Sequence, residues 1–153
     1  MRPWSMLVLL PLLAACEPEP VPQPTPRATA DPVVAKQETE RRQLLSGAAG
    51  PGDFKATFGE PFVGFENRGA RMAISQSYEG PAYRVVDVAA SREGGAWVFR
   101  GQEGAVPGSE AFVLTIEKAD CVHEFSGERT AYTAWLGDAA QPRRLRSCAA
   151  PAK

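Results

Sequence analysis

Reactive side chains are few in this sequence. It holds one histidine, His123, and three cysteines, Cys16, Cys121 and Cys148. Ser126 follows His123 too closely to indicate a catalytic triad, and the sequence has no nucleophile-elbow motif. Carboxylates near predicted turns, at Glu60, Glu66, Glu124 and Glu128, are typical of solvated loop residues. The sequence therefore predicts a protein that is not an enzyme, has no catalytic residue and uses no cofactor.

The beginning of the chain has the pattern of an export signal. One basic residue, Arg2, precedes an apolar run from Met6 to Ala15. A helix of this length reaches only about 15 Å, half of the hydrocarbon core of a bilayer. The run is therefore too short to span a membrane, and we interpret residues 1–15 as a signal peptide.

The end of this signal is similar to a known motif. Leu13, Ala14, Ala15 and Cys16 resemble the lipobox of bacterial lipoproteins. The resemblance implies cleavage before Cys16 and attachment of fatty acyl chains, such as palmitate, to that residue, which would then bind the membrane through its lipid. In that family an aspartate after the cysteine favours the inner membrane. Glu17 stands there instead, so we expect the periplasmic face of the outer membrane.

Cys121 and Cys148 remain as an even pair once Cys16 is acylated. In an exported protein such a pair favours a disulfide, and a redox role is less well supported because no C-x-x-C motif is present. A zinc site of Cys121, His123, Glu124 and Cys148 is a further alternative. The Cys-x-His spacing is unusual for zinc, and exported thiols tend to oxidise first, so we expect no metal.

A tether is predicted between the anchor and the folded part. Six prolines fall within residues 17–32, which favours extended, polyproline-type backbone. Asp31 and Pro32 then form a helix start signal and Gly47 a stop, with Glu38 placed to pair with Arg41 and Arg42. This helix has no continuous apolar face, so we interpret residues 16–52 as lipidated cysteine plus tether.

Residues 53–150 are predicted to form an all-β domain. Apolar residues there recur with a period of two, and turn signals separate the runs. We expect seven to eight short strands in a small antiparallel β-barrel or sandwich. The expected strands are 54–58, 62–67, 71–76, 83–89, 97–100, 111–117, 131–136 and 143–147, with turns at 80–81, 93–95, 106–108 and 137–138.

Charge excludes some partners. The chain has 17 basic and 18 acidic residues, so no strongly positive field indicates nucleic-acid binding. The mean hydropathy of -0.24 argues against a polytopic membrane protein.

Two segments of the domain resemble a group of uncharacterised bacterial envelope proteins. Residues 54–62 are similar to the group's F-x-A-x-G-x-E-P-F-W opening, with Val63 in place of the final tryptophan. Residues 114–121, 125–127, 132–134 and 146–149 are similar to its closing pattern of a strand, a cysteine, a turn, a Tyr-x-Ala strand and Gly-Cys-Ala. The resemblance implies a Cys121–Cys148 pair. It implies no activity.

The sequence favours a lipid-anchored envelope protein that acts as a binding or stress-related module. The candidate binding surface combines the turn of Glu60, Pro61 and Phe62 with the loop of His123, Glu124, Ser126 and Gly127. The partner would be an envelope protein or a cell-wall component. Two alternatives are an inhibitor of a cell-wall hydrolase such as lysozyme and a small lipid-binding barrel.

Overall fold

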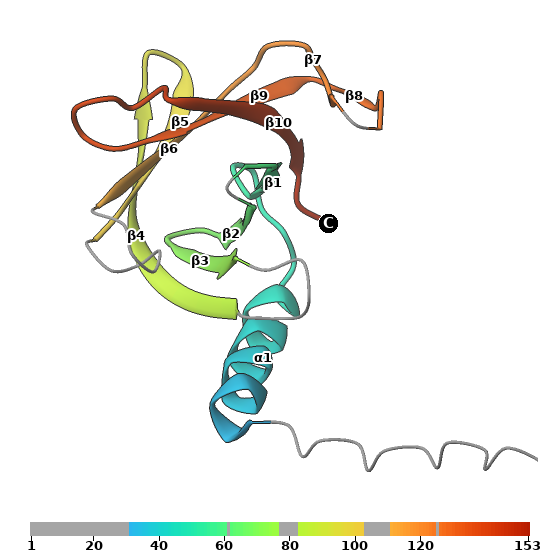
Figure 1. The fold of residues 1–153 in the computed structure, drawn as a ribbon, viewed down its shortest axis with the longest axis vertical. Helices are drawn as coiled ribbons and strands as arrows, with labels where there is room; N and C mark the ends of the chain where they lie inside the picture. The colour runs from blue at the N-terminus through green and yellow to red at the C-terminus, as the bar shows by residue number, and fades with distance from the viewer. Residues whose placement is uncertain (1–30, 61, 77–82, 103–110, 125) are drawn as a thin grey trace, which may run out of the picture.

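The chain forms a closed antiparallel β-barrel, as predicted (Figure 1). This computed structural model describes residues 31–60, 62–76, 83–102, 111–124 and 126–153. Eight strands make up the barrel and two short ones form a separate hairpin. In chain order the elements are α1 (Pro32–Leu45), β1 (Phe54–Phe58), β2 (Val63–Arg68), β3 (Arg71–Ser75), β4 (Tyr83–Glu93), β5 (Ala96–Gly101), β6 (Phe112–Glu117), β7 (Cys121–Val122), β8 (Arg129–Thr130), β9 (Tyr132–Gly137) and β10 (Leu145–Pro151).

The barrel runs up and down, each strand pairing with the next one along the chain. Only the β7–β8 hairpin interrupts this order, between β6 and β9, and β10 returns to pair with β1. Two tight turns show why glycine is needed. Gly69 alone has a positive φ in the β2–β3 turn, the pattern of a type II′ turn, whereas Gly94 and Gly95 both have one between β4 and β5, as in type I′.

Side chains fill the inside of the barrel. The alternation expected from the sequence places every second residue inward, as at Phe54, Ala56 and Phe58 of β1. These residues pack with apolar side chains from the other barrel strands, among which Phe99, Met72, Ile74, Leu114 and Ile116 are almost fully buried. The core is therefore built of layers of aromatic and aliphatic side chains.

The predicted helix is present as α1. Asp31 caps it by accepting a hydrogen bond from the Val33 amide at 2.8 Å, and Arg42 pairs with Glu38 at 2.6 Å. The prediction that it only extends the tether was incomplete. The helix lies against β3 and β4, with Leu44 buried at its C-terminal end. No helix in the described part of the chain is long and apolar enough to cross a membrane.

Strands β4 and β10 differ most from the predicted ranges, and each of the other barrel strands agrees with its prediction to within one residue at either end. β4 continues to Glu93 because its exposed second half still pairs with β5, although its polar residues resemble a turn. β10 begins at Leu145 rather than 143 and continues to Pro151. The two-residue strands β7 and β8 are too short to leave a periodic pattern and were not predicted. The predicted turns at 80–81 and 106–108 lie outside the described residues.

A buried polar cluster closes the barrel where β1 begins. Asn67 is 2% exposed, accepts a hydrogen bond from the Phe54 amide and donates to the carbonyl oxygens of Gly52 and Gly69. Asp53, 7% exposed, accepts from the amides of Gly50 and Gly69. We call Asp53 and Asn67 with these partners the polar cluster.

The guanidinium group of Arg68 extends this closure. It donates to the main-chain oxygens of Gly47 and Lys153 and pairs with Glu66. Glu66, expected as a solvated loop residue, is thus a strand residue in a largely buried ion pair. The incoming tether and the last residues of the chain are therefore tied to the same hairpin.

Candidate functional site

The seam between β1 and β10 is paired along only part of its length. The register runs from Phe54 opposite Pro151 to Ala56 opposite Ala149 and ends there. Both strands continue: β1 pairs with β2 as far as Phe58, and β10 pairs with β9 from Leu145 onward. Beyond Ala56 the two strands thus keep their outer partners but have no ladder between them in the described structure.

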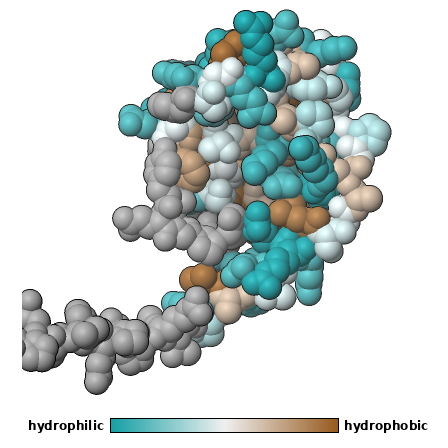
Figure 2. Space-filling view, turned by 90° about the vertical axis from the view of Figure 1, so that its right-hand side faces the viewer, coloured by the Kyte–Doolittle hydropathy of each residue, from teal (hydrophilic) through white to brown (hydrophobic). Residues whose placement is uncertain are grey.

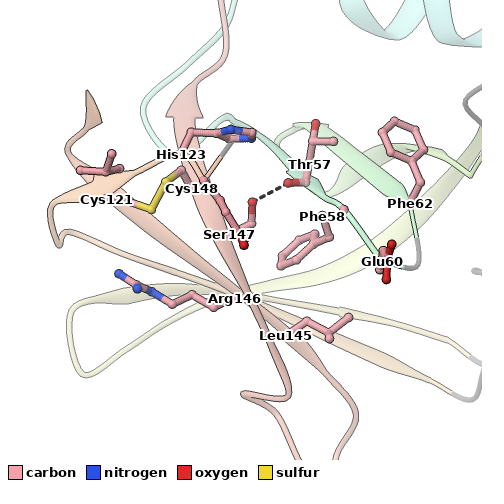
Figure 3. A pocket seen from close by; sticks show the side chains of 13 residues that line it. Thr57, Phe58, Glu60, Phe62, Cys121, His123, Leu145, Arg146, Ser147 and Cys148 are labelled. Atoms are coloured by element: carbon pink, nitrogen blue, oxygen red, sulfur yellow. Dashed lines mark hydrogen bonds between the residues drawn. A yellow bond between two sulfur atoms is a disulfide. The ribbon is translucent and has the colours of Figure 1, made fainter. Parts of the chain in front are cut away.

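A side chain bridges the point where the ladder stops. The Ser147 hydroxyl donates a hydrogen bond to the main-chain oxygen of Thr57, which Figure 3 shows as a dashed line. In the register of the seam, the main-chain partner of Thr57 would be Cys148. The serine hydroxyl therefore takes the place of a main-chain donor at this position.

The diverging strands border an open groove, which we call the slot. Its volume is about 1110 Å³, slightly above the range of about 300–1,000 Å³ common for small-molecule sites. It is lined by residues 57–60 and 62 from the end of β1 and the β1–β2 connection, residues 121–124 from β7 and the loop after it, and residues 145–148 from β10. Three segments far apart in the sequence thus form one site.

The walls of the slot combine apolar and polar groups. The buried ring of Phe58 and the half-buried side chains of Phe62 and Leu145 provide apolar surface. Glu60 and Glu124 are exposed lining residues, and neither has an ion pair with another residue that the structure describes. The slot therefore offers two carboxylates beside an apolar floor.

His123 contributes an imidazole to the same wall. Its ring extends from the loop after β7 toward the β1 side of the slot, where Thr57 lies (Figure 3). Its Nδ1 accepts a hydrogen bond from the Ser126 amide at 3.4 Å.

A disulfide fixes the third wall of the slot. Cys121 and Cys148 are bonded, with their Cα atoms 5.5 Å apart, so the predicted pairing is confirmed. The bond attaches the β7–β8 hairpin, here called the arm, to β10. Two sulfur atoms in a disulfide cannot act as thiolate zinc ligands, and the described residues hold no group of three or more metal-ligating side chains.

The arm carries an exposed apolar residue beside the slot. Val122 is 56% exposed and lines the slot. Elsewhere hydrophilic residues cover most of the described part of the face in Figure 2, and hydrophobic residues form small separate spots. A single exposed aliphatic side chain is ordinary on a protein surface, so Val122 counts here only as part of the slot lining.

The structure brings together four residues of the predicted binding surface. Glu60, Phe62, His123 and Glu124 all line the slot, although about 60 residues separate the two pairs in the sequence. Ser126 and Gly127 lie in the turn of the arm and do not line it. Pro61 lies outside the described residues. Whether this surface binds a ligand stays a prediction.

The wall of the slot that β10 forms was not predicted from the sequence. Leu145, Arg146 and Ser147 line the slot, and none was a candidate. Their local pattern is that of an ordinary strand, with Leu145 and Ser147 on one face and Arg146 on the other. No signal in the sequence shows that this strand separates from β1.

A second polar group lies on β6 and β9. Glu117 accepts hydrogen bonds from the Trp135 indole at 2.8 Å and from Arg143 at 2.9 Å. The Trp135 hydrogen bond, aided by Arg143, lowers the pKa of Glu117. Arg146 also lies over the Trp135 ring, 5.8 Å from its centroid. This carboxylate is already partnered and serves to order the surface of the strands.

Comparisons with known proteins place the chain in no family. Searches against protein-family models, curated proteins and solved structures found no match.

Proposed function

We propose that this chain is a non-catalytic, lipid-anchored binding module of the bacterial cell envelope, and that the slot is its binding site. The observation that carries the proposal is the unpaired half of the β1–β10 seam. A closed barrel normally leaves no strand edge open, so a groove of about 1110 Å³ in its wall is a specific feature.

The position of the helix supports an anchored arrangement. α1 lies against β3 and β4, and β4 is separated from β10 by β5, β6 and β9 in the order around the barrel. In Figure 1 the helix is at the bottom and the arm at the top right. A tether that arrives through α1 would leave the slot accessible to a partner.

The anchor is tested by replacing Cys16. In cells fed an alkyne analogue of palmitate, we expect the full chain to carry the label and Cys16→Ala to lose both the label and its place in the membrane fraction. Cys121→Ser is the matched control and should keep both. A Cys16→Ala protein with a cleaved signal that stays in the membrane pellet would contradict the anchor.

The slot is tested by photo-crosslinking in intact cells. A benzoylphenylalanine replaces Phe62 in the slot or Ala90, an exposed residue of β4, as the matched control. We expect a discrete crosslinked product at position 62 and none at position 90. Equal products at both positions, or none at either, would mean that the slot is not the binding site.

The arm favours one alternative, inhibition of a cell-wall hydrolase. It stands outside the barrel sheet, is held by a disulfide and carries the exposed Ser126 in its turn. Such an arm is suited to insertion into the cleft of an enzyme. Lysozyme activity measured with the full chain in detergent tests this: inhibition abolished by Ser126→Glu, at unchanged thermal stability, would favour the inhibitor.

A lipid-binding barrel, the other alternative, needs space for an acyl chain. The inward side chains of the described strands pack on one another, with Phe58, Phe99 and Met72 buried at the centre. We therefore place the proposed ligand in the slot rather than inside the barrel.

A further inference from the structure

We infer that the slot binds an extended, basic segment of a partner protein, which pairs with the open edge of β10 as an added strand. This inference rests on the proposed function and names the chemical class of its ligand. Three features of the slot support this ligand: the direction of the main-chain groups in β10, the length and volume of the slot, and the charges on its rim.

The main-chain groups of β10 face the slot at alternate positions. Ala152 donates its amide to the main-chain oxygen of Asp53, so its main-chain groups point toward β1. Main-chain groups alternate in direction along a regular strand, and the register of β10 has no bulge. Cys148 and Arg146 therefore direct their N–H and C=O groups toward the β1 side, beyond the end of the ladder.

The β1 side does not complete this pairing. Thr57 follows the last paired residue, and its main-chain oxygen accepts from the Ser147 hydroxyl. Its place in the alternation is the same as that of Asp53, whose main-chain oxygen faces β10. Because the Ser147 hydroxyl already occupies this oxygen, an added strand would pair with β10 alone, along the part of its edge that runs from Arg146 toward Leu145.

The dimensions fit a short strand. Residues 145–148 extend over about 13 Å at about 3.3 Å per residue, the length of a four-residue segment. A slot of about 1110 Å³ exceeds most small-molecule sites, so a peptide segment fits it better. Phe58, Leu145 and the exposed Val122 can then contact the side chains of such a segment.

The charges favour a basic segment. Glu60 and Glu124 line the slot without an ion pair to another described residue. The one arginine of the lining, Arg146, has its guanidinium 5.8 Å from the Trp135 ring, and Figure 3 shows this side chain directed away from Glu60. A lysine or arginine of the ligand would therefore meet two carboxylates.

Capped octapeptides of alternating valine and lysine, labelled with fluorescein, are the probe. Binding to the full chain in neutral detergent is measured by fluorescence anisotropy. A valine–glutamate peptide tests the charge preference. A valine–lysine peptide N-methylated at alternate residues tests pairing of the main chain, because methylation removes the amide donors of one edge.

We expect the lysine peptide to bind about five- to tenfold more tightly than either of the other two, as two lost ion pairs or two lost hydrogen bonds predict. Replacing both rim carboxylates, in Glu60→Gln with Glu124→Gln, should weaken lysine-peptide binding about five- to tenfold. Glu38→Gln with Glu40→Gln, on α1, is the matched control: it changes the net charge equally and should leave the affinity unchanged. Unfolding midpoints confirm that the variants are folded.

Several results would overturn the inference. These are no binding of the lysine peptide at about 1 mM, equal binding of the N-methylated peptide, or an equal effect of the two double variants. If the peptides fail while the crosslink at position 62 still forms, the proposed function stands and the ligand belongs to another class. If both fail, the slot is not a binding site.

Discussion

The two halves of the β1–β10 seam are held together by different means. At its closed half, the polar cluster joins the tether, the β2–β3 hairpin and the end of the chain through several hydrogen bonds that are buried or part-buried. At its open half, a hydrogen bond from the Ser147 hydroxyl connects β10 to β1, and one disulfide connects β10 to the arm. No buried polar side-chain atom of the described structure lacks a partner.

This difference explains how a small barrel can carry a groove. Opening a seam exposes strand edges and apolar residues, which costs stability that must come from elsewhere. The closed half supplies buried, cooperative contacts, and the disulfide restrains the arm without filling the slot. The closed half of the β1–β10 pair therefore provides stability, and the open half provides an accessible groove.

The largest expected effect comes from the disulfide. Replacing Cys121 and Cys148 together with alanine should lower the free energy of unfolding by about 3.5 kcal/mol, because the bond closes a loop of 27 residues in the unfolded chain. Urea unfolding measures this loss. In this variant, hydrogen exchange should speed up more for the amides of the arm than for the amide of Phe54. A loss below about 1 kcal/mol with unchanged exchange would show that the arm is held by other contacts.

The polar cluster should give the next largest effect. Asn67→Ala leaves the Phe54 amide and two carbonyl oxygens without their partner, and we expect a loss of about 3 kcal/mol in urea unfolding. Thr133→Val is the control, since buried Thr133 makes one such hydrogen bond, to Ala119, and should cost about 1 kcal/mol. If the two variants lose equal amounts of unfolding free energy, the polar cluster stabilises the closed half no more than a single buried hydrogen bond would.

Ser147 should have a smaller and more local effect. Ser147→Ala removes the hydroxyl that bridges to Thr57, and we expect a loss of about 1 kcal/mol or less. Hydrogen exchange should become faster in β1 after Ala56 and stay unchanged at Phe54. Ser91→Ala, on the exposed part of β4, serves as the control. Faster exchange along the whole of β1 would mean that the two halves are not independent.

The smallest effect is expected from an exposed ion pair outside both halves. Hydrogen bonds from Arg100, and then from Ser91, lower the pKa of Glu93 from 4.5 to about 2. The pair therefore adds stability above pH 4.5 and loses it as the pH falls toward 2. The difference in unfolding midpoint between the protein and Glu93→Gln should be small at pH 7 and vanish near pH 2. A difference that grows as the pH falls would contradict this assignment.

Local patterns in the sequence predicted much of the fold. Alternating apolar residues marked most barrel strands, and Asp31 with Pro32 marked the start of the helix. The failures have a common cause. Two-residue strands such as Cys121–Val122 are shorter than any periodic signal. The exposed residues of β4 and the alanines of β10 pair through their main chains, which side-chain patterns do not report.

The all-β class, the helix and the pairing of Cys121 with Cys148 could be predicted from local periodicity, capping and cysteine chemistry. The return of β10 to β1, and the end of their ladder at Ala56 and Ala149, became visible in the folded barrel alone. Nearly one hundred residues separate these strands, and no local pattern carries such a register. The slot exists because of that register, so four of its predicted residues met there only once the barrel had closed.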